Sequence, residues 1–203
     1  MFGIKSISLG SALFVAVVFS PLAQADFYYD YRPQAERQFL GCEITPVVGA
    51  DIGLGYTQDV IDLKSSSSFA GGFYIGAEIA QITEVRFGYS HLGQYKLNSG
   101  LKYNFDTYDI DLRVKAPVSA EYKLYGGVGL AKTHSKESGV GGGKSDNRSA
   151  FKGIAGIEKR AGKGALTFEV NHYNRVPTYS QSLYGNSQSA GVTAFKLGYK
   201  HKF

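Results

Sequence analysis

The sequence has few of the residues and patterns that mark several large classes of protein. Its 203 residues include one cysteine, one methionine and no tryptophan. The single Cys42 excludes an internal disulfide framework, and no Cys/His cluster has the spacing of a metal site. After residue 25 no apolar run reaches the roughly 18 residues that a membrane-spanning helix needs. The formal charge of +5 is not gathered into a Lys/Arg run, so the sequence does not predict a nucleic-acid-binding protein.

Residues 1–25 have the pattern of a secretory signal peptide. A basic residue, Lys5, precedes an apolar run that is too short to cross a bilayer. The segment ends in Ala-Gln-Ala, and small residues in this arrangement are typical of a cleavage site. We therefore expect cleavage after Ala25 and export of the rest of the chain. The alternative is that this segment stays in place as a short membrane anchor.

Glycine and aromatic residues are abundant and alternate with polar residues. The chain contains 26 Gly, 15 Tyr and 13 Phe, a composition that favours antiparallel sheet over helix. After a polar, tyrosine-rich lead-in at 26–45, whose role the sequence leaves open, eight segments follow the two-residue period of a strand. They lie at about 47–58, 69–79, 82–92, 102–115, 120–131, 149–159, 164–175 and 193–203. In the last of them Phe195 and Leu197 alternate with Lys196, and lysines inside with aromatic residues outside fit a membrane better than water.

The connections between these segments are short at one end of the strands and long at the other. Tight connections lie near 80–82, 116–119 and 160–163, and long ones, rich in Ser, Gly and Asn, near 59–68, 93–101, 132–148 and 176–190. In lipid every backbone polar group must be paired, so a sheet can span a membrane only when it closes on itself. We predict an all-β fold, an eight-stranded antiparallel up-and-down transmembrane β-barrel over residues 46–203, in which the last strand pairs with the first.

The charged residues at inward positions predict an ionic network inside this barrel. The predicted members are Glu78, Glu84, Arg86, Asp109, Asp111, Arg113, Glu121, Lys123, Lys152, Glu158, Glu169, Lys196 and Lys200. Eight strands enclose a space that side chains just fill, and charges removed from water must pair with one another. We expect a plug of salt bridges, and a narrow pore of low conductance is the alternative.

The whole mature chain resembles the small eight-stranded outer-membrane barrels, such as the transmembrane domain of outer membrane protein A and its single-domain relatives. The resemblance rests on strand number, on loop asymmetry and on the ending Phe195, Leu197, Tyr199 and Phe203. It implies location in the outer membrane of a Gram-negative cell, with this ending as the signal for the barrel-assembly machinery. His201 departs from the apolar residue that is usual at its position. The chain ends with the barrel, so we expect no peptidoglycan-binding domain.

The function that we expect is structural or surface-interacting, of the adhesion or colonisation type, and is carried by the extracellular loops. The expected partners are outer-membrane lipids, lipopolysaccharide and a host surface or glycan, and the protein is expected to be a monomer that needs no cofactor. The segment 132–148 sets the basic residues Lys132, His134, Lys136, Lys144 and Arg148 against Glu137 and Asp146. It could meet phosphates or anionic glycans, and the alternative is a solvated loop without a ligand. Its sequence GVGGGKS is not a phosphate loop, because Ser138 stands where the first glycine is required.

His172 is the residue that an enzymatic alternative would use. It falls at an outward position, and the sequence around it is similar to the His-x-Ser motif of the lipid A deacylases of the outer membrane. Asn174 stands in place of the serine, however, and no acidic residue is evident on the same face to orient the imidazole. We therefore expect no catalytic residue and no enzyme activity, with a lipid A-modifying hydrolase as the alternative.

Overall fold

The structure, a computed structural model, describes residues 38–39, 42–57, 66–98, 100, 102–138, 145–179 and 187–203. The predicted signal peptide, its cleavage at Ala25 and most of the lead-in lie outside these residues. The strands are β1 (Gln38–Phe39), β2 (Cys42–Thr57), β3 (Ser67–Ile79), β4 (Thr83–Lys96), β5 (Lys102–Pro117), β6 (Tyr122–Ser138), β7 (Ser145–Ala161), β8 (Gly164–Tyr179) and β9 (Ser187–Lys202). Among the described residues no helix is long and apolar enough to cross a membrane.

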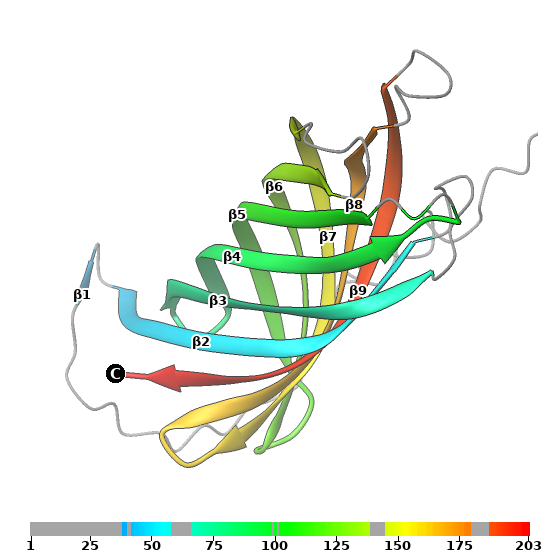
Figure 1. Ribbon diagram of the computed structural model, residues 1–203. Helices are drawn as coiled ribbons and strands as arrows, with labels where there is room; N and C mark the ends of the chain where they lie inside the picture. The colour runs from blue at the N-terminus through cyan, green and yellow to red at the C-terminus, as the bar shows by residue number, and fades with distance from the viewer. Residues whose placement is uncertain are drawn as a thin grey trace, which may run out of the picture. The chain divides into compact units, whose positions relative to one another are not determined.

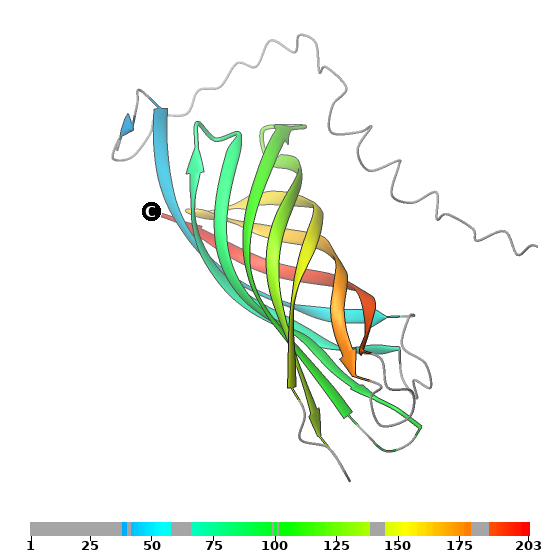
Figure 2. The same cartoon turned by 90° about the horizontal axis from the view of Figure 1, so that it is seen from above.

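Strands β2 to β9 form a closed antiparallel barrel in chain order (Figure 1). Closure comes from the pairing of β2 with β9, which runs from Val47 opposite Lys202 to Thr57 opposite Val192. The amide of Phe203 adds one more bond, to the carbonyl of Pro46 at 3.2 Å. Seen from above, the strands cross the barrel obliquely and side by side (Figure 2). The predicted eight-stranded barrel, with its first strand bonded to its last, is confirmed.

The first barrel strand begins earlier than the sequence predicted. β2 starts at Cys42, inside the expected lead-in, and the two-residue β1 pairs with it through Phe39 opposite Cys42. The short turns are confirmed in kind: the chain reverses over 80–82, 118–121 and 162–163. In the first of these turns two residues other than glycine have a left-handed backbone, Ala80 with φ 50° and Gln81 with φ 61°.

Two of the four long loops were predicted too long. β4 continues to Lys96 and β5 begins at Lys102, while β6 continues to Ser138 and β7 begins at Ser145. The segments 93–101 and 132–148 are therefore mostly strand. Their Ser, Asn, Gly and Lys residues gave them the composition of loops, but the described parts belong to strands that extend past the membrane, with Lys132 and Lys136 outward and Ser135 inward.

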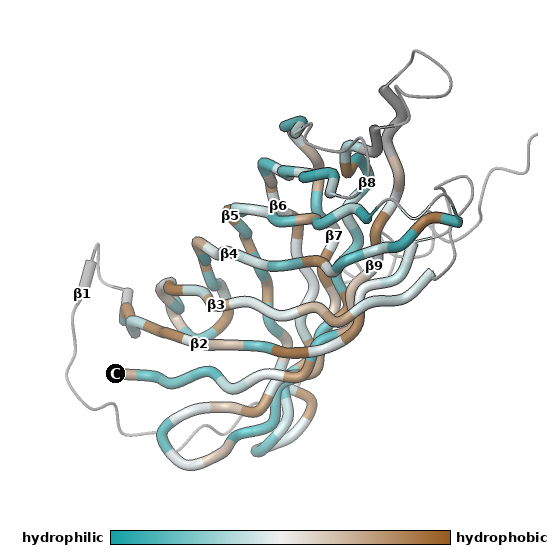
Figure 3. Tube along the Cα trace, viewed as in Figure 1, coloured by the Kyte–Doolittle hydropathy of each residue, from teal (hydrophilic) through white to brown (hydrophobic). Residues whose placement is uncertain are grey.

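The outer wall of the barrel is an apolar belt. Large apolar side chains stand exposed at alternate positions of every barrel strand, as the two-residue period predicted. They include Ile52, Leu54, Phe73, Ile75, Phe87, Tyr108, Ile110, Leu112, Val128, Leu130, Phe151, Leu166, Phe168 and Leu197. Figure 3 shows the resulting alternation of hydrophobic and hydrophilic positions along the strands. A continuous surface of this kind is stable in lipid and not in water.

Above the belt the barrel extends into a second region, which we name the extracellular extension: residues 91–98, 102–107, 131–138, 145–150, 171–179 and 187–194. Its interior contains one buried apolar cluster, beside buried polar residues such as Thr107, Thr133 and Asn171. The members of the cluster are Leu92, Tyr95, Tyr103, Phe105, Ala131, Ala150, Tyr173, Val176 and Val192. The rings of Tyr95 and Phe105 lie 5.4 Å apart. This core closes the lumen at the end that carries the longer loops.

Candidate functional site

The structure brings most of the predicted ionic network together inside the barrel. Eleven predicted residues are buried: Glu78, Glu84, Arg86, Asp109, Asp111, Arg113, Lys152, Glu158, Glu169, Lys196 and Lys200. Lys123 lies at the rim, with its ammonium 3.7 Å from a Glu78 oxygen. The prediction for Glu121 was wrong. The chain turns over 118–121, where the Ser119 hydroxyl accepts from the Glu121 amide at 3.3 Å, and the Glu121 side chain faces solvent.

At the short-turn end of the lumen, two lysines each contact the same three carboxylates. Lys200 Nζ lies 3.3 Å from Glu78, 2.9 Å from Glu84 and 2.5 Å from Glu158. Lys115 contacts the same three groups and is equally buried, although the sequence-based list did not include it. It lies one step of two residues beyond Arg113, so the strand period contained the signal. The carboxylates are close enough to hold a metal ion, but the two ammonium groups already compensate their charge.

A second cluster fills the middle of the lumen around Arg113. Its guanidinium is bonded to Glu169 through both terminal nitrogens and to Asp111 at 2.9 Å. Lys152 donates to Asp109 at 3.1 Å and to Asp111 at 2.8 Å. Acceptors and donors are shared so closely that the cluster forms a single hydrogen-bonded unit, as buried charges require.

Buried side chains occupy the described part of the lumen. A cavity of about 10 Å³ lies beside the cluster around Arg113, with Asp51, Ser90 and Lys196 also in its lining and room for about one water molecule. Unbonded polar atoms of Tyr74, Arg86 and Arg113 belong to residues that line it. With the apolar core of the extension above and the ionic network below, the described interior is a packed plug.

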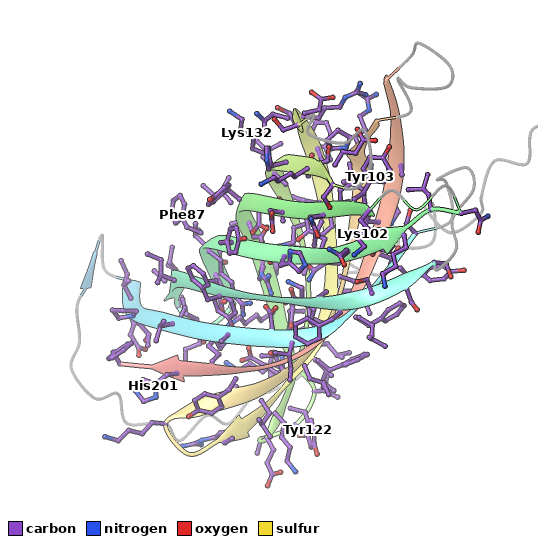
Figure 4. All side chains as sticks on the ribbon, in the orientation of Figure 1. Phe87, Lys102, Tyr103, Tyr122, Lys132 and His201 are labelled. Atoms are coloured by element: carbon purple, nitrogen blue, oxygen red, sulfur yellow. The ribbon has the colours of Figure 1, made fainter. Side chains whose placement is uncertain are left out.

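The outer surface of the extension is polar and positively charged. Lys96, Lys102, Lys132 and Lys136 are exposed at outward positions of β4 to β6. Lys96 and Lys102 stand directly opposite each other across the β4–β5 pair, an arrangement that repels and that a bound anion would relieve. Figure 4 shows Lys132 above the lipid-facing Phe87, and Lys102 to the right of it. These lysines, which lie on the outer surface of neighbouring strands in the extension, form a candidate anion-binding surface.

Asp106 is the carboxylate at the outward positions of this wall, within the described parts of β4 to β7, and it is already bonded. Its Oδ1 accepts from the Tyr89 hydroxyl at 3.0 Å and lies 2.8 Å from His91 Nδ1. On the next strand, His134 stands opposite Asp106 and bonds Asn147 at 2.7 Å. The sequence analysis did not identify this His–Asp pair, because its members lie 15 residues apart on two strands.

His172 faces outward as predicted, but its surroundings lack the groups of a catalytic triad. Its Nδ1 lies 3.0 Å from the Thr193 hydroxyl, and no described carboxylate bonds it. Asn174, which stands where a serine would be needed, accepts from the Phe151 amide at 2.9 Å. The hydroxyl beside the imidazole is therefore that of Thr193, and among the described residues no carboxylate orients the ring as a triad requires.

The predicted assembly signal lies on the outer wall of β9. Phe195, Leu197 and Tyr199 are exposed at alternate positions, and Phe203 follows the strand. The ring of His201 packs edge-on against Phe203, with centroids 4.8 Å apart. His201 therefore departs from the usual apolar residue in polarity but still makes an aromatic contact.

Comparisons with known proteins identify the fold. No described protein family matches the sequence, and no curated protein is similar to it in sequence. Among solved structures the chain is similar to Neisserial surface protein A, with a TM-score of 0.61 and 12% identity over 78% of this chain and 97% of that one. It is also similar to the attachment invasion locus protein Ail of Yersinia pestis, solved with the heparin analogue sucrose octasulfate, with a TM-score of 0.50 and 14% identity over 79% and 97% of the two chains.

A third similar structure is the N-terminal β-barrel domain of OprF from Pseudomonas aeruginosa, with a TM-score of 0.50 and 11% identity over 76% of this chain and 96% of that domain. Identities this low establish shared architecture and carry no residue roles across. The apolar belt, the plugged lumen and these structural similarities all fit a barrel of the outer membrane. A protein in that membrane must be exported, as the signal peptide predicted at residues 1–25 requires. The chain has the fold of the small eight-stranded β-barrels of the bacterial outer membrane.

Proposed function

We propose that the protein is a surface-interaction protein without enzyme activity, whose extracellular extension binds an anionic glycan outside the cell. The observation that carries the proposal is the cationic outer wall of the extension, and above all the facing pair Lys96 and Lys102. The packed lumen argues against a role in conducting solutes, and this supports a function at the extracellular end.

The geometry of this end suits binding. The strands of the extension are held from inside by the apolar core, so the backbone that carries the lysines is already ordered before a ligand binds, and only the side chains lose freedom. The similar barrel Ail has been solved with a heparin analogue, which supports a sulfated glycan as the ligand class. An adhesion-type role follows if that glycan belongs to a host surface.

The test is binding of the purified protein, in a neutral detergent, to immobilised heparin. We expect the double variant Lys96→Gln/Lys102→Gln to bind on the order of tenfold more weakly, since each lysine beside an anionic surface contributes about 1 kcal/mol. A matched control is Lys159→Gln/Lys163→Gln, which removes two exposed lysines at the opposite rim. Equal losses in the two variants would show that binding depends on net charge alone, and the proposal would be wrong.

A hydrolase acting on lipids of the outer leaflet is the second candidate. The observation in its favour is the His91–Asp106 pair, because a carboxylate on Nδ1 orients an imidazole to act as a base through Nε2. No serine or cysteine is among the described hydrogen-bond partners of His91. Mass spectrometry of lipid A from cells with and without the protein decides between the candidates. Loss of an acyl chain that is restored by His91→Ala would establish the hydrolase.

A further inference from the structure

The outward face of β6 carries two lysines directly above the last lipid-facing residue of that strand. Leu130 is 59% exposed and belongs to the apolar belt. Lys132 takes the next outward position, about 7 Å further along the strand, and Lys136 lies about 20 Å beyond Leu130. Lys132 therefore stands where the acyl chains end, and Lys136 stands further out, among the groups that cover them.

Aromatic residues mark the same level on both neighbouring strands. Lys132 is paired across the sheet with Tyr108 on β5, while Phe151 on β7 stands opposite Leu130. Both aromatic side chains are exposed on the outer wall. Aromatic rings are enriched at the boundary between the hydrocarbon and the lipid headgroups. Tyr108 and Phe151 therefore indicate that this boundary lies at the level of the Lys132 backbone.

The charges of the two lysines are available for a ligand. Neither Lys132 nor Lys136 forms an ion pair within the part of the chain that the structure describes. The nearest outward carboxylate, Asp106, is bonded by Tyr89 and lies 2.8 Å from His91. Two ammonium groups on one exposed strand thus face the outer leaflet without compensation.

Hydroxyl groups stand beside each lysine. Ser149 is the cross-strand partner of Lys132, and Ser145 is the partner of Lys136, and both serines are exposed. A phosphate group accepts hydrogen bonds from ammonium and hydroxyl donors together. The wall behind them is fixed, because Ala131 and Ala150 on the inner face belong to the apolar core of the extension.

We propose that the outward face of β6 binds the phosphate groups of a phosphorylated glycolipid of the outer leaflet, with Lys132 at the membrane surface and Lys136 further out. The occupant is a lipid and not a free anion, because the apolar belt continues directly below Lys132 through Leu130 and Val128. Acyl chains on that part of the belt bring their own headgroup to the two lysines. The site is separate from the glycan surface, which uses Lys96 and Lys102.

The experiment is native mass spectrometry of the full chain in a neutral detergent, titrated with diphosphoryl lipid A and with the same lipid after removal of its phosphates. We expect Lys132→Gln/Lys136→Gln to weaken binding of diphosphoryl lipid A by about tenfold or more, since hydrogen bonds to charged groups contribute on this order. Lys96→Gln/Lys102→Gln is the matched control and should leave binding unchanged. The dephosphorylated lipid should bind the wild-type protein as weakly as diphosphoryl lipid A binds the double variant.

Three results would overturn the proposal: wild-type affinity in Lys132→Gln/Lys136→Gln, equal binding of the dephosphorylated lipid, or full displacement of the lipid by inorganic phosphate. The conservative variant Lys132→Arg keeps the charge and should keep the affinity, and its heat-modifiable migration in gels confirms that the barrel is folded. Heparin binding by Lys132→Gln/Lys136→Gln is measured in parallel. If heparin binding fails in every protein while lipid binding follows the lysines, the glycan function is wrong and the lipid site stands.

Discussion

The membrane-spanning half of the barrel and the extracellular extension use the same strands with opposite polarity. Strand β5 shows the change within one element. Its outward residues run Leu112, Ile110, Tyr108 and then Asp106, Asn104, Lys102, while its inward residues run Arg113, Asp111, Asp109 and then Thr107, Phe105, Tyr103. Inward and outward positions alternate without a break along the strand. Between Tyr108 and Asp106 the medium outside the barrel changes from lipid to water, and the residue types on both faces change with it.

The two halves are therefore held together by different forces. In the membrane half the apolar side chains can face lipid and need not be buried inside the protein. The interior of that half can therefore be polar, provided that its charges pair with one another. In water the extension must hide apolar side chains, so its inside resembles the core of a water-soluble protein. Substitutions that cut one kind of interaction should weaken one half far more than the other.

The largest expected effect is the removal of one charge from the lumen. Glu169 is buried and contacts Arg113, with Arg86 at 3.6 Å and the Tyr125 hydroxyl at 2.9 Å. Glu169→Gln leaves two guanidinium groups without their shared carboxylate, and we expect a loss of about 3–5 kcal/mol in unfolding free energy. Urea unfolding in phospholipid vesicles measures it. Glu121→Gln, in an exposed turn, should change stability by less than about 0.5 kcal/mol, and similar losses in both variants would contradict the ionic plug.

The next effect tests the apolar core of the extension with two phenylalanines. Phe105 is fully buried there, whereas Phe87 is 56% exposed on the lipid-facing wall. Phe105→Ala opens a cavity and should cost about 3 kcal/mol, and Phe87→Ala opens none and should cost clearly less. Unfolding measurements in vesicles give the two values. A protease added outside the vesicles should cleave the extension faster in Phe105→Ala than in Phe87→Ala. Equal cleavage of the two variants would contradict the presence of a separate apolar core in the extension.

A smaller effect locates the boundary between the two regions. Leu112 and Asn104 occupy the same outward face of β5, one within the belt and one above it. Leu112→Lys places an ammonium against hydrocarbon and should cost about 2 kcal/mol, whereas Asn104→Lys, in water but opposite Lys136, should cost less than about 1 kcal/mol. Vesicle-based unfolding of the two variants gives the comparison. A cost at Asn104 equal to that at Leu112 would mean that the membrane reaches higher than Tyr108.

The strand period predicted which charges face inward, because a closed sheet imposes one direction on every second residue. This is why Glu78, Asp111 and Lys200 were placed correctly from the sequence alone. The period fails where a strand ends, and Glu121 was misplaced because its segment was continued through a turn. The extension was missed for a different reason: composition was weighed above period, although Tyr103 and Phe105 continue the inward face of β5.

Contacts across the lumen are beyond what one sequence can show. The sharing of Glu78, Glu84 and Glu158 by Lys115 and Lys200 depends on the relative register of five strands. Strand periodicity gives the face of a residue and not its height against a distant strand. The pairing of His91 with Asp106 was invisible for the same reason, since a shift of two residues between β4 and β5 would separate them and keep both on the outer wall.

The smallest expected effect lies in the turn between β3 and β4, at the rim below the lumen. Ala80 and Gln81 both have left-handed backbones, which Asn and Gly adopt at little cost. The amide of Ala80 donates to the carbonyl of Glu43 at 2.9 Å, and the Lys123 ammonium donates to the carbonyl of Gln81 at 3.2 Å, so neighbouring groups hold the turn in place. Gln81→Gly removes the strain without touching either backbone contact and should raise the unfolding free energy by about 1 kcal/mol. Urea unfolding of Gln81→Gly beside Gln81→Ala, which keeps the strain, isolates the backbone term, because both variants lose the same side-chain contacts. A higher unfolding free energy in both variants would assign the effect to the loss of the glutamine side chain. A higher value in Gln81→Gly alone would show that the left-handed backbone at this rim is strained, and that the ionic interior of the membrane half is stable enough to tolerate the strain.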